Sequence, residues 1–251
     1  MFNAKEEKDK IVKFIREYYE KYNLGGVVIG ISGGKDSGVV AGLFAEALGP
    51  ERIIGITLPC HSKETDKNDA QLVADYYGFK MLNIDLSLVF DTFKDQIELL
   101  GDFTPEELKN SDINLKPRLR MASLYYVAAL YTALKGKTYI VAGTGNKCEE
   151  YVGYFTKGGD SVSDIKVIAD LTVDEVIAIG EEVNVPPEVL YKTPNDGLSN
   201  QSDEDKLGVT YKDIAKYMNG EELDEDVKKK IKKWHDTTRH KFFIPTYKKE
   251  D

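Results

Sequence analysis

The chain has 251 residues, of which 41% are hydrophobic and 31% charged, a composition typical of a globular protein with a buried core. It contains no apolar run of the roughly 18 residues that a membrane-spanning helix needs, and we expect no membrane partner. The charged stretch Met1–Lys10 does not resemble a secretory signal. The net charge of −9 disfavours a nucleic-acid partner, because an acidic surface repels phosphate backbones. The two cysteines, Cys60 and Cys148, fit no metal-binding spacing and indicate reduced thiols in a cytoplasmic protein.

Short β-branched runs alternate along the chain with stretches of helical periodicity. In chain order we expect a helix at 5–23, a strand at 27–31, a helix at 37–48, a strand at 52–58, a helix at 67–77, a strand at 79–84, a helix that begins at Thr104, a helix at 118–134, a strand at 138–142, a helix that begins at Thr172, and helices at 211–218 and 224–234. Such alternation indicates βαβ units. We predict one α/β domain over residues 1–251, with a doubly wound, mostly parallel, Rossmann-like sheet and helices on both faces. Residues 186–208 are expected to form a long loop, mobile near 190–205, before a helical C-terminal segment.

A glycine-rich turn, GISGGKDS at residues 30–37, joins the first predicted strand to the next helix. Ligands of parallel sheets bind beyond the carboxyl ends of the strands. Gly33 and Gly34 allow a phosphate to approach the backbone, and the N–H groups that open the helix favour an anion. The turn is not a Walker A motif, because Ile29 stands where that motif has its first glycine and Asp36 follows the lysine. A carboxylate inside a phosphate site needs a cation between the two, so Asp36 predicts Mg²⁺.

The hexapeptide SGGKDS resembles the SGGxDS loop of the ATP pyrophosphatases, a superfamily that includes NAD, GMP and asparagine synthetases and tRNA-modifying enzymes. The resemblance implies that the loop holds the pyrophosphate that leaves when ATP adenylates a carboxylate or carbonyl oxygen. The residues that would contact ATP here are Gly30, Ile31, Ser32, Gly33, Gly34, Lys35, Asp36 and Ser37. The loop therefore indicates the reaction type and leaves the substrate open.

The segment GTGNKCEEYVGYFTKGGD at residues 143–160 resembles the signature of the NAD synthetases at nearly every defined position. Residues 116–121, residues 202–211 and the pair His240-Lys241 resemble other segments of that family, so the resemblance extends from about residue 5 to residue 245. It implies an ammonia-dependent enzyme that uses ATP to adenylate the nicotinate carboxylate of deamido-NAD. Ammonia would then displace AMP to give NAD.

The resemblance also implies a role for each matching residue. Asp36 and Glu149 would bind Mg²⁺, and Thr144 and Asn195 would contact ATP. The residues expected to bind deamido-NAD are Arg118, Lys157, Asp164, His240 and Lys241. Asp160, a further carboxylate in the signature, is a candidate catalytic residue that accepts a proton from ammonium.

Two positions depart from the family pattern. Val173 stands where the family has a lysine that touches ATP, and Asn195 stands where it has Thr or Ser. We expect ATP to be held less tightly, or the missing charge to be supplied by Lys166, Lys192 or Lys35.

Two alternatives stay open at this point. The chain could be another SGGxDS-loop adenylating enzyme that acts on a different carboxylate or on tRNA, or a binding module for adenine nucleotides without catalysis. Only a short helix precedes the synthetase-like region, so we expect no glutaminase domain and free ammonia as the nitrogen donor, unless a separate subunit supplies it. The family also implies a homodimer.

Overall fold

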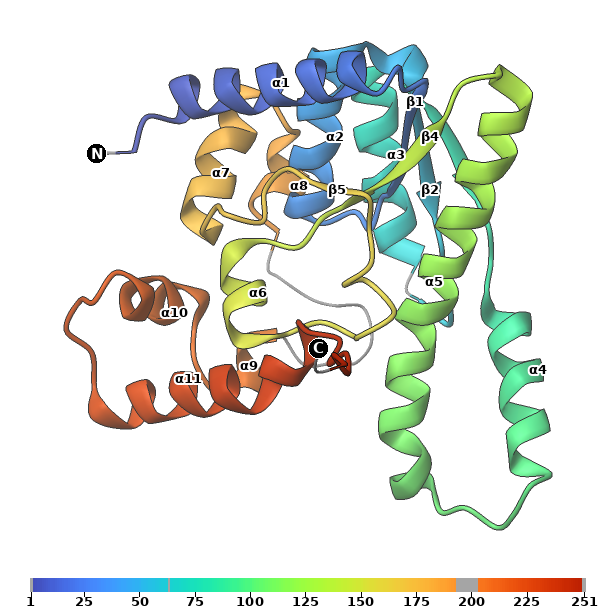
Figure 1. Cartoon of the computed structure of the whole chain (residues 1–251), viewed down its shortest axis with the longest axis vertical. Helices are drawn as coiled ribbons and strands as arrows, with labels where there is room; N and C mark the ends of the chain where they lie inside the picture. Colours follow the sequence, from blue (N-terminus) through green and yellow to red (C-terminus); the bar gives the residue numbers. More distant parts are fainter. Residues whose placement is uncertain (1, 63, 193–202, 250–251) are drawn as a thin grey trace.

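The computed structural model describes residues 2–62, 64–192 and 203–249, and in these residues five parallel strands form one sheet (Figure 1). The strand order is β3-β2-β1-β4-β5. Their bounds are Gly26–Gly30 for β1, Ile53–Thr57 for β2, Lys80–Asn83 for β3, Tyr139–Gly143 for β4 and Ile165–Lys166 for β5. In the register, Val28 of β1 lies opposite Ile54 on one side and Val141 on the other. The predicted doubly wound parallel sheet is confirmed.

Helices cover both faces of the sheet, because successive strand residues point to opposite sides. Val27 and Ile29 belong to a core shared with one group of helices, whereas Val28 packs in a second core on the other face. The first face carries α1 (Ala4–Lys21), α2 (Lys35–Leu48), α3 (Glu64–Tyr77), α7 (Val173–Glu182) and α8 (Pro187–Leu190). The second face carries α4 (Ser87–Glu98) and α5 (Pro105–Lys135). A short 3₁₀ turn, η1 (Pro50–Arg52), follows α2.

Helix α5 is longer than expected, because it runs for 31 residues through Pro117. We predicted a helix from Thr104 and another from Arg118. The capping box formed by Thr104 and Glu107 begins α5 as predicted, and Gly136 in the left-handed conformation (φ +68°) ends it. Buried Pro117 lies so close to Gly159 that a Cβ on that glycine would come within 2.9 Å of the proline Cβ. This packing holds the helix continuous across a residue that lacks an N–H donor.

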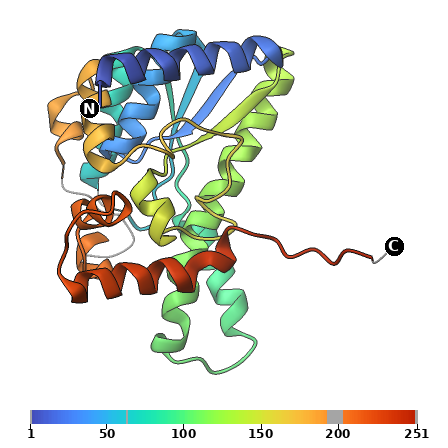
Figure 2. The same cartoon turned by 60° about the vertical axis from the view of Figure 1, so that its left-hand side comes forward.

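The C-terminal helices form a separate core, here called the C-terminal cluster. Its elements are α6 (Lys147–Val152), α9 (Asp203–Leu207), α10 (Tyr211–Met218), α11 (Glu225–Thr238) and the 3₁₀ turn η2 (Arg239–Lys241). Buried Cys148, Val152, Tyr211, Ile214 and Ile231 lie among its core residues. The cluster lies beside the carboxyl end of the sheet, and the chain after η2 extends away from the body (Figure 2).

Several short elements were not predicted. Helices α8 and α9 occupy part of the segment 186–208, so the prediction of a loop is wrong in those two stretches. Residues 193–202, and with them Asn195 and most of the expected mobile segment, lie outside the described residues. Helix α4 and the two-residue strand β5 were also missed. No helix among the described residues combines the length and apolar character needed to cross a membrane.

Candidate functional site

The candidate site lies where the strand order reverses. Strand β1 pairs with β2 on one side and with β4 on the other, so the loops that follow β1 and β4 leave the same edge of the sheet from neighbouring strands. Open α/β sheets bind their ligands at such a switch point. The glycine-rich turn at 30–37 follows β1, and Thr144 to Asn146 follow β4. The two segments that carry the sequence signatures therefore meet at one edge of the sheet.

The glycine-rich turn is shaped by its two serines. The Ser32 hydroxyl accepts a hydrogen bond from Gly34 N at 3.2 Å, and the Ser37 hydroxyl donates to Gly34 O at 3.0 Å. Gly33 has a φ of +79°, a conformation that a residue with a side chain adopts only with strain. No side chain caps the start of α2 at Gly34, so the first N–H groups of the helix can bind an anion.

Two carboxylates meet beside this turn, and we call Asp36 and Glu149 the acid pair. Asn146, whose side chain is fully buried, connects them. Its side-chain amide donates to Asp36 Oδ1 at 3.3 Å, and its backbone N–H donates to Glu149 Oε2 at 3.0 Å. The Asn146 side-chain oxygen accepts from Cys148 N and Glu149 N at 3.0 and 3.2 Å and so caps α6. We had assigned Asn146 no role, although an Asn three residues before a Glu is a capping-box signal.

The electrostatics of the acid pair favour a cation. Burial raises the pKa of Glu149 well above its ordinary value, and the charge of Asp36 raises it further. Lys35 Nζ lies 2.9 Å from Asp36 Oδ2. Burial lowers the pKa of Lys35, but the charge of Asp36 and a hydrogen bond to it outweigh this effect, so the pKa is raised and the lysine stays protonated.

The donor set fits Mg²⁺. No group of three or more acidic, histidine or cysteine side chains suited to a metal occurs among the described residues. Magnesium is usually held by one or two carboxylates, with phosphate oxygens and water as the other ligands. Two carboxylates next to a turn whose uncapped N–H groups suit an anion match this preference. Asp36 and Glu149 are the residues that would hold the ion.

Four of the five residues expected to bind deamido-NAD lie together, and we call them the cationic group: Arg118, Lys157, His240 and Lys241. Arg118 Nε donates to Lys157 O at 3.3 Å, and Lys157 Nζ donates to His240 O at 3.1 Å. Lys241 Nζ donates to the Gly153 and Phe155 carbonyls at 2.8 and 2.9 Å. The group draws on α5, on the turn after α6 and on η2, so only the folded chain assembles it.

The two remaining carboxylates of the predicted site make their bonds elsewhere. Asp164 accepts from Tyr125 OH at 3.1 Å and from Val141 N at 2.8 Å, which fixes the turn before β5. Asp160 accepts from Thr156 N at 2.8 Å within the signature turn. Neighbouring atoms that displace water raise the pKa of the Asp160 carboxyl, although the residue keeps contact with solvent. A raised pKa favours proton transfer near neutral pH, and the catalytic role of Asp160 stays a prediction.

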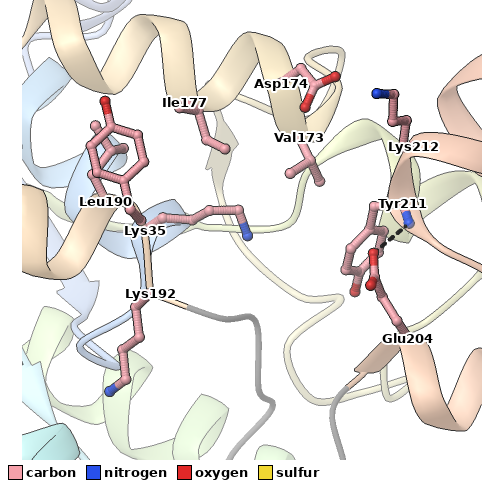
Figure 3. A pocket seen from close by; sticks show the side chains of 10 residues that line it. Lys35, Val173, Asp174, Ile177, Leu190, Lys192, Glu204, Tyr211 and Lys212 are labelled. Atoms are coloured by element: carbon pink, nitrogen blue, oxygen red, sulfur yellow. Dashed lines mark hydrogen bonds between the residues drawn. The ribbon is translucent and has the colours of Figure 1, made fainter.

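The three lysines expected to replace the missing family lysine already have partners. Lys166 forms an ion pair with Glu150, and Lys192 Nζ lies 2.7 Å from Asp69 Oδ2. Lys35 is bonded to Asp36 of the acid pair, and both Lys35 and Lys192 line the same pocket as Val173 (Figure 3).

Comparisons with known proteins identify the family of the chain. Residues 7–245 match the family described as NAD synthase. An NH(3)-dependent NAD(+) synthetase of Carboxydothermus hydrogenoformans is 36% identical over 244 residues, which are 97% of each chain. The structure of an NMN synthetase from Francisella tularensis has 31% identity and a TM-score of 0.88, with 99% of both chains covered. An NH3-dependent NAD synthetase from Campylobacter jejuni, 26% identical with a TM-score of 0.77, covers 99% of this chain and is itself covered completely, at 100%. The chain belongs to the NAD synthase family.

Proposed function

We propose that the protein makes NAD from deamido-NAD and ammonia, with ATP converted to AMP and pyrophosphate. The observation that carries the proposal is the acid pair, Asp36 and Glu149, joined through Asn146 beside a turn that presents N–H groups to an anion. Relatives named as NH(3)-dependent NAD(+) synthetases support ammonia as the nitrogen donor. They also favour a nicotinate carboxylate over the tRNA substrates of other enzymes with this loop.

The chemistry needs an activated carboxylate. A carboxylate is a poor electrophile, whereas an acyl-adenylate carries AMP as a good leaving group. The N–H groups of the turn and the Lys35 ammonium neutralise charge that develops on the departing pyrophosphate. When bound, Mg²⁺ supplies further neutralisation of the phosphate oxygens. Its carboxylate ligands would be Asp36 and Glu149.

The cationic group supplies the complementary surface for a dinucleotide. Its guanidinium and ammonium groups match the diphosphate and carboxylate of deamido-NAD. Lys157 Nζ donates to the His240 carbonyl in η2, and Lys241 Nζ donates to the Gly153 carbonyl in the signature turn, which holds both ammonium groups in fixed places. We assign Arg118, Lys157, Asp164, His240 and Lys241 to this substrate, Thr144 and Asn195 to ATP, and Asp160 to proton acceptance from ammonium.

A second candidate substrate is nicotinate mononucleotide. The F. tularensis structure named as an NMN synthetase has a TM-score of 0.88, against 0.77 for the C. jejuni NAD synthetase, and the higher identity of 31%. The amidation chemistry is the same for both substrates, because each carries the nicotinate carboxylate. They differ in the adenylate half, which only the dinucleotide presents to the protein.

One assay tests the proposal and separates the two substrates. Purified protein is incubated with ATP, Mg²⁺ and ammonium, with either deamido-NAD or nicotinate mononucleotide, and AMP, pyrophosphate and the amide product are quantified. We expect NAD to form in equal amount with AMP and to require all four components. The Asp36→Asn variant controls for contaminating activity. A higher kcat/KM for the mononucleotide would make NMN the physiological product, and no amide product from either substrate would contradict the proposal.

We also propose a cytoplasmic homodimer of a single domain. Leu88 on α4 and Tyr126 and Leu134 on α5 are 77%, 75% and 66% exposed, and apolar surface of this kind supports an interface between two copies. Both cysteines are free and buried, which suits a reducing compartment. Size-exclusion chromatography with light scattering tests the dimer.

A further inference from the structure

A pocket of about 320 Å³ extends the phosphate-binding turn toward the C-terminal cluster (Figure 3). It lies between the start of α2, the first turns of α7, the end of α8, and the helices α9 and α10. Lys35 lines it from the turn itself, and Lys212, the second residue of α10, lines it from the C-terminal cluster. The pocket therefore has walls from both parts of the fold.

Lys35 makes the pocket continuous with the anion site. Its side chain is only 6% exposed and extends from the start of α2, where the free N–H groups lie, into the pocket. A phosphate chain bound to those N–H groups would therefore lie alongside the Lys35 side chain. The wall beside it is apolar where Val173 and Ile177 face the space, so α7 contributes no cation there.

Of the three lysines in the pocket, Lys212 is the one with no bond of its own. The Lys192 side chain points away from the space and is bonded to Asp69 at 2.7 Å (Figure 3). Lys35 is bonded to Asp36 at 2.9 Å. Lys212 forms no hydrogen bond or ion pair with any residue that the structure describes, and its long exposed side chain lies across the pocket from Lys35.

Two carboxylates, Asp174 and Glu204, also line the pocket, and Glu204 accepts a hydrogen bond from Tyr211 N at 2.9 Å. They would repel a bare anion. A phosphate chain that already carries Mg²⁺ has a smaller net charge, and it is the occupant that such a mixed lining fits best. The acid pair beside the same turn would hold that ion.

We propose that Lys212 is a further ATP-binding residue, which with Lys35 holds the terminal phosphates of magnesium-bound ATP in this pocket. This inference deepens the proposed function and depends on it. It also gives the C-terminal cluster a direct contact with the leaving pyrophosphate. Deamido-NAD, the substrate that receives the ammonia, takes no part in this contact.

The test compares Lys212→Gln with Lys216→Gln, a matched substitution one turn further along α10 at a lysine that does not line the pocket. Calorimetry measures the binding of Mg–ATP and of Mg–pyrophosphate, and steady-state kinetics give each KM. We expect Lys212→Gln to weaken both ligands roughly tenfold, because one exposed charge-assisted contact is lost. Lys212→Arg should retain most of the affinity. The KM for deamido-NAD and the melting temperature should stay unchanged in all three variants.

Equal binding of Mg–ATP by wild type and Lys212→Gln would overturn the inference while leaving the proposed function intact, provided that wild type still makes NAD. Equal weakening of ATP and deamido-NAD would also overturn it, since it would mark a general disturbance of the site. Failure of the wild type to bind ATP would overturn both the inference and the proposed function.

Discussion

Replacement of Glu149 by Gln should stabilise the protein while abolishing its activity. The wild-type carboxyl is surrounded by protein and lies beside Asp36, and both effects raise its pKa. An acid whose pKa is higher in the folded than in the unfolded state binds more protons when folded. The free energy of unfolding therefore falls as pH rises between the two values, and the loss is complete only above the folded pKa. Glutamine has no proton to lose, so the Glu149→Gln variant should escape this loss.

The size of the effect follows from the contacts. Each unit by which the folded pKa exceeds the unfolded one costs about 1.4 kcal/mol once the pH is above the folded value. Glutamine keeps an acceptor for Asn146 N, now 3.0 Å from Glu149 Oε2, and loses only the charge of that hydrogen bond, about 1 kcal/mol. We expect a net gain in the free energy of unfolding, and each kcal/mol of it raises the melting temperature by about 2–4 °C for a chain of this length.

The measurement is urea denaturation of wild type and Glu149→Gln between pH 5 and pH 8, with divalent cations chelated. Glu175→Gln is the matched control, because Glu175 holds the same capping-box position on α7. Added Mg²⁺ should stabilise the wild type far more than Glu149→Gln. If the free energy of unfolding of Glu149→Gln declines with pH as steeply as that of the wild type, the electrostatic account of the acid pair is wrong.

Three further outcomes follow from the same site. Asp36→Asn should abolish turnover without changing the circular dichroism spectrum. Combining it with Glu149→Gln should lower activity little further, because both acids serve the same step, the departure of pyrophosphate. Normal activity of Asp36→Asn with Mg²⁺ would show that Asp36 does not belong to the ion site. The purified chain should make NAD from ammonium and none from ammonia-free glutamine, which product analysis by mass spectrometry checks. Val173→Lys should lower the KM for ATP roughly tenfold and leave that for deamido-NAD unchanged, because Val173 lines the same pocket as Lys35. A flat KM with a lower melting temperature would instead mean that Val173 serves the packing of the C-terminal cluster.

Local sequence was enough to predict strands β1 to β4, the glycine-rich turn and the capping boxes that begin α5 and α7. The runs around Val28, Ile54 and Val141 are β-branched and are buried on both sides, which is the pattern that a central parallel strand imposes. The capping boxes at Thr104 and Thr172 also use only neighbouring residues, and both are present. These features depend on interactions within a few positions of the chain.

Features that depend on distant residues were missed. Asn146 and Asp36 are 110 positions apart, so nothing near Asn146 reveals that its amide reaches the acid pair. The continuity of α5 through Pro117 depends on packing against Gly159, which contradicts the local preference of proline. Strand β5 has only two residues, which pair with the end of β4. It is too short for an alternating pattern to appear in the sequence.

Helix α6 contributes residues both to the C-terminal cluster and to the acid pair. Cys148 and Val152 are buried in the C-terminal cluster, whereas Glu149 one residue along belongs to the acid pair. Thr238 Oγ1 donates to Val152 O at 3.1 Å and Arg239 Nη2 to Tyr151 O at 2.9 Å, so α11 and η2 anchor the end of this short helix. If the acid pair holds Mg²⁺ as proposed, affinity for the ion should depend on the integrity of α11 and η2, although none of their residues is a proposed metal ligand. Heat or truncation that loosens α11 would abolish the activity of the enzyme while the sheet remains folded.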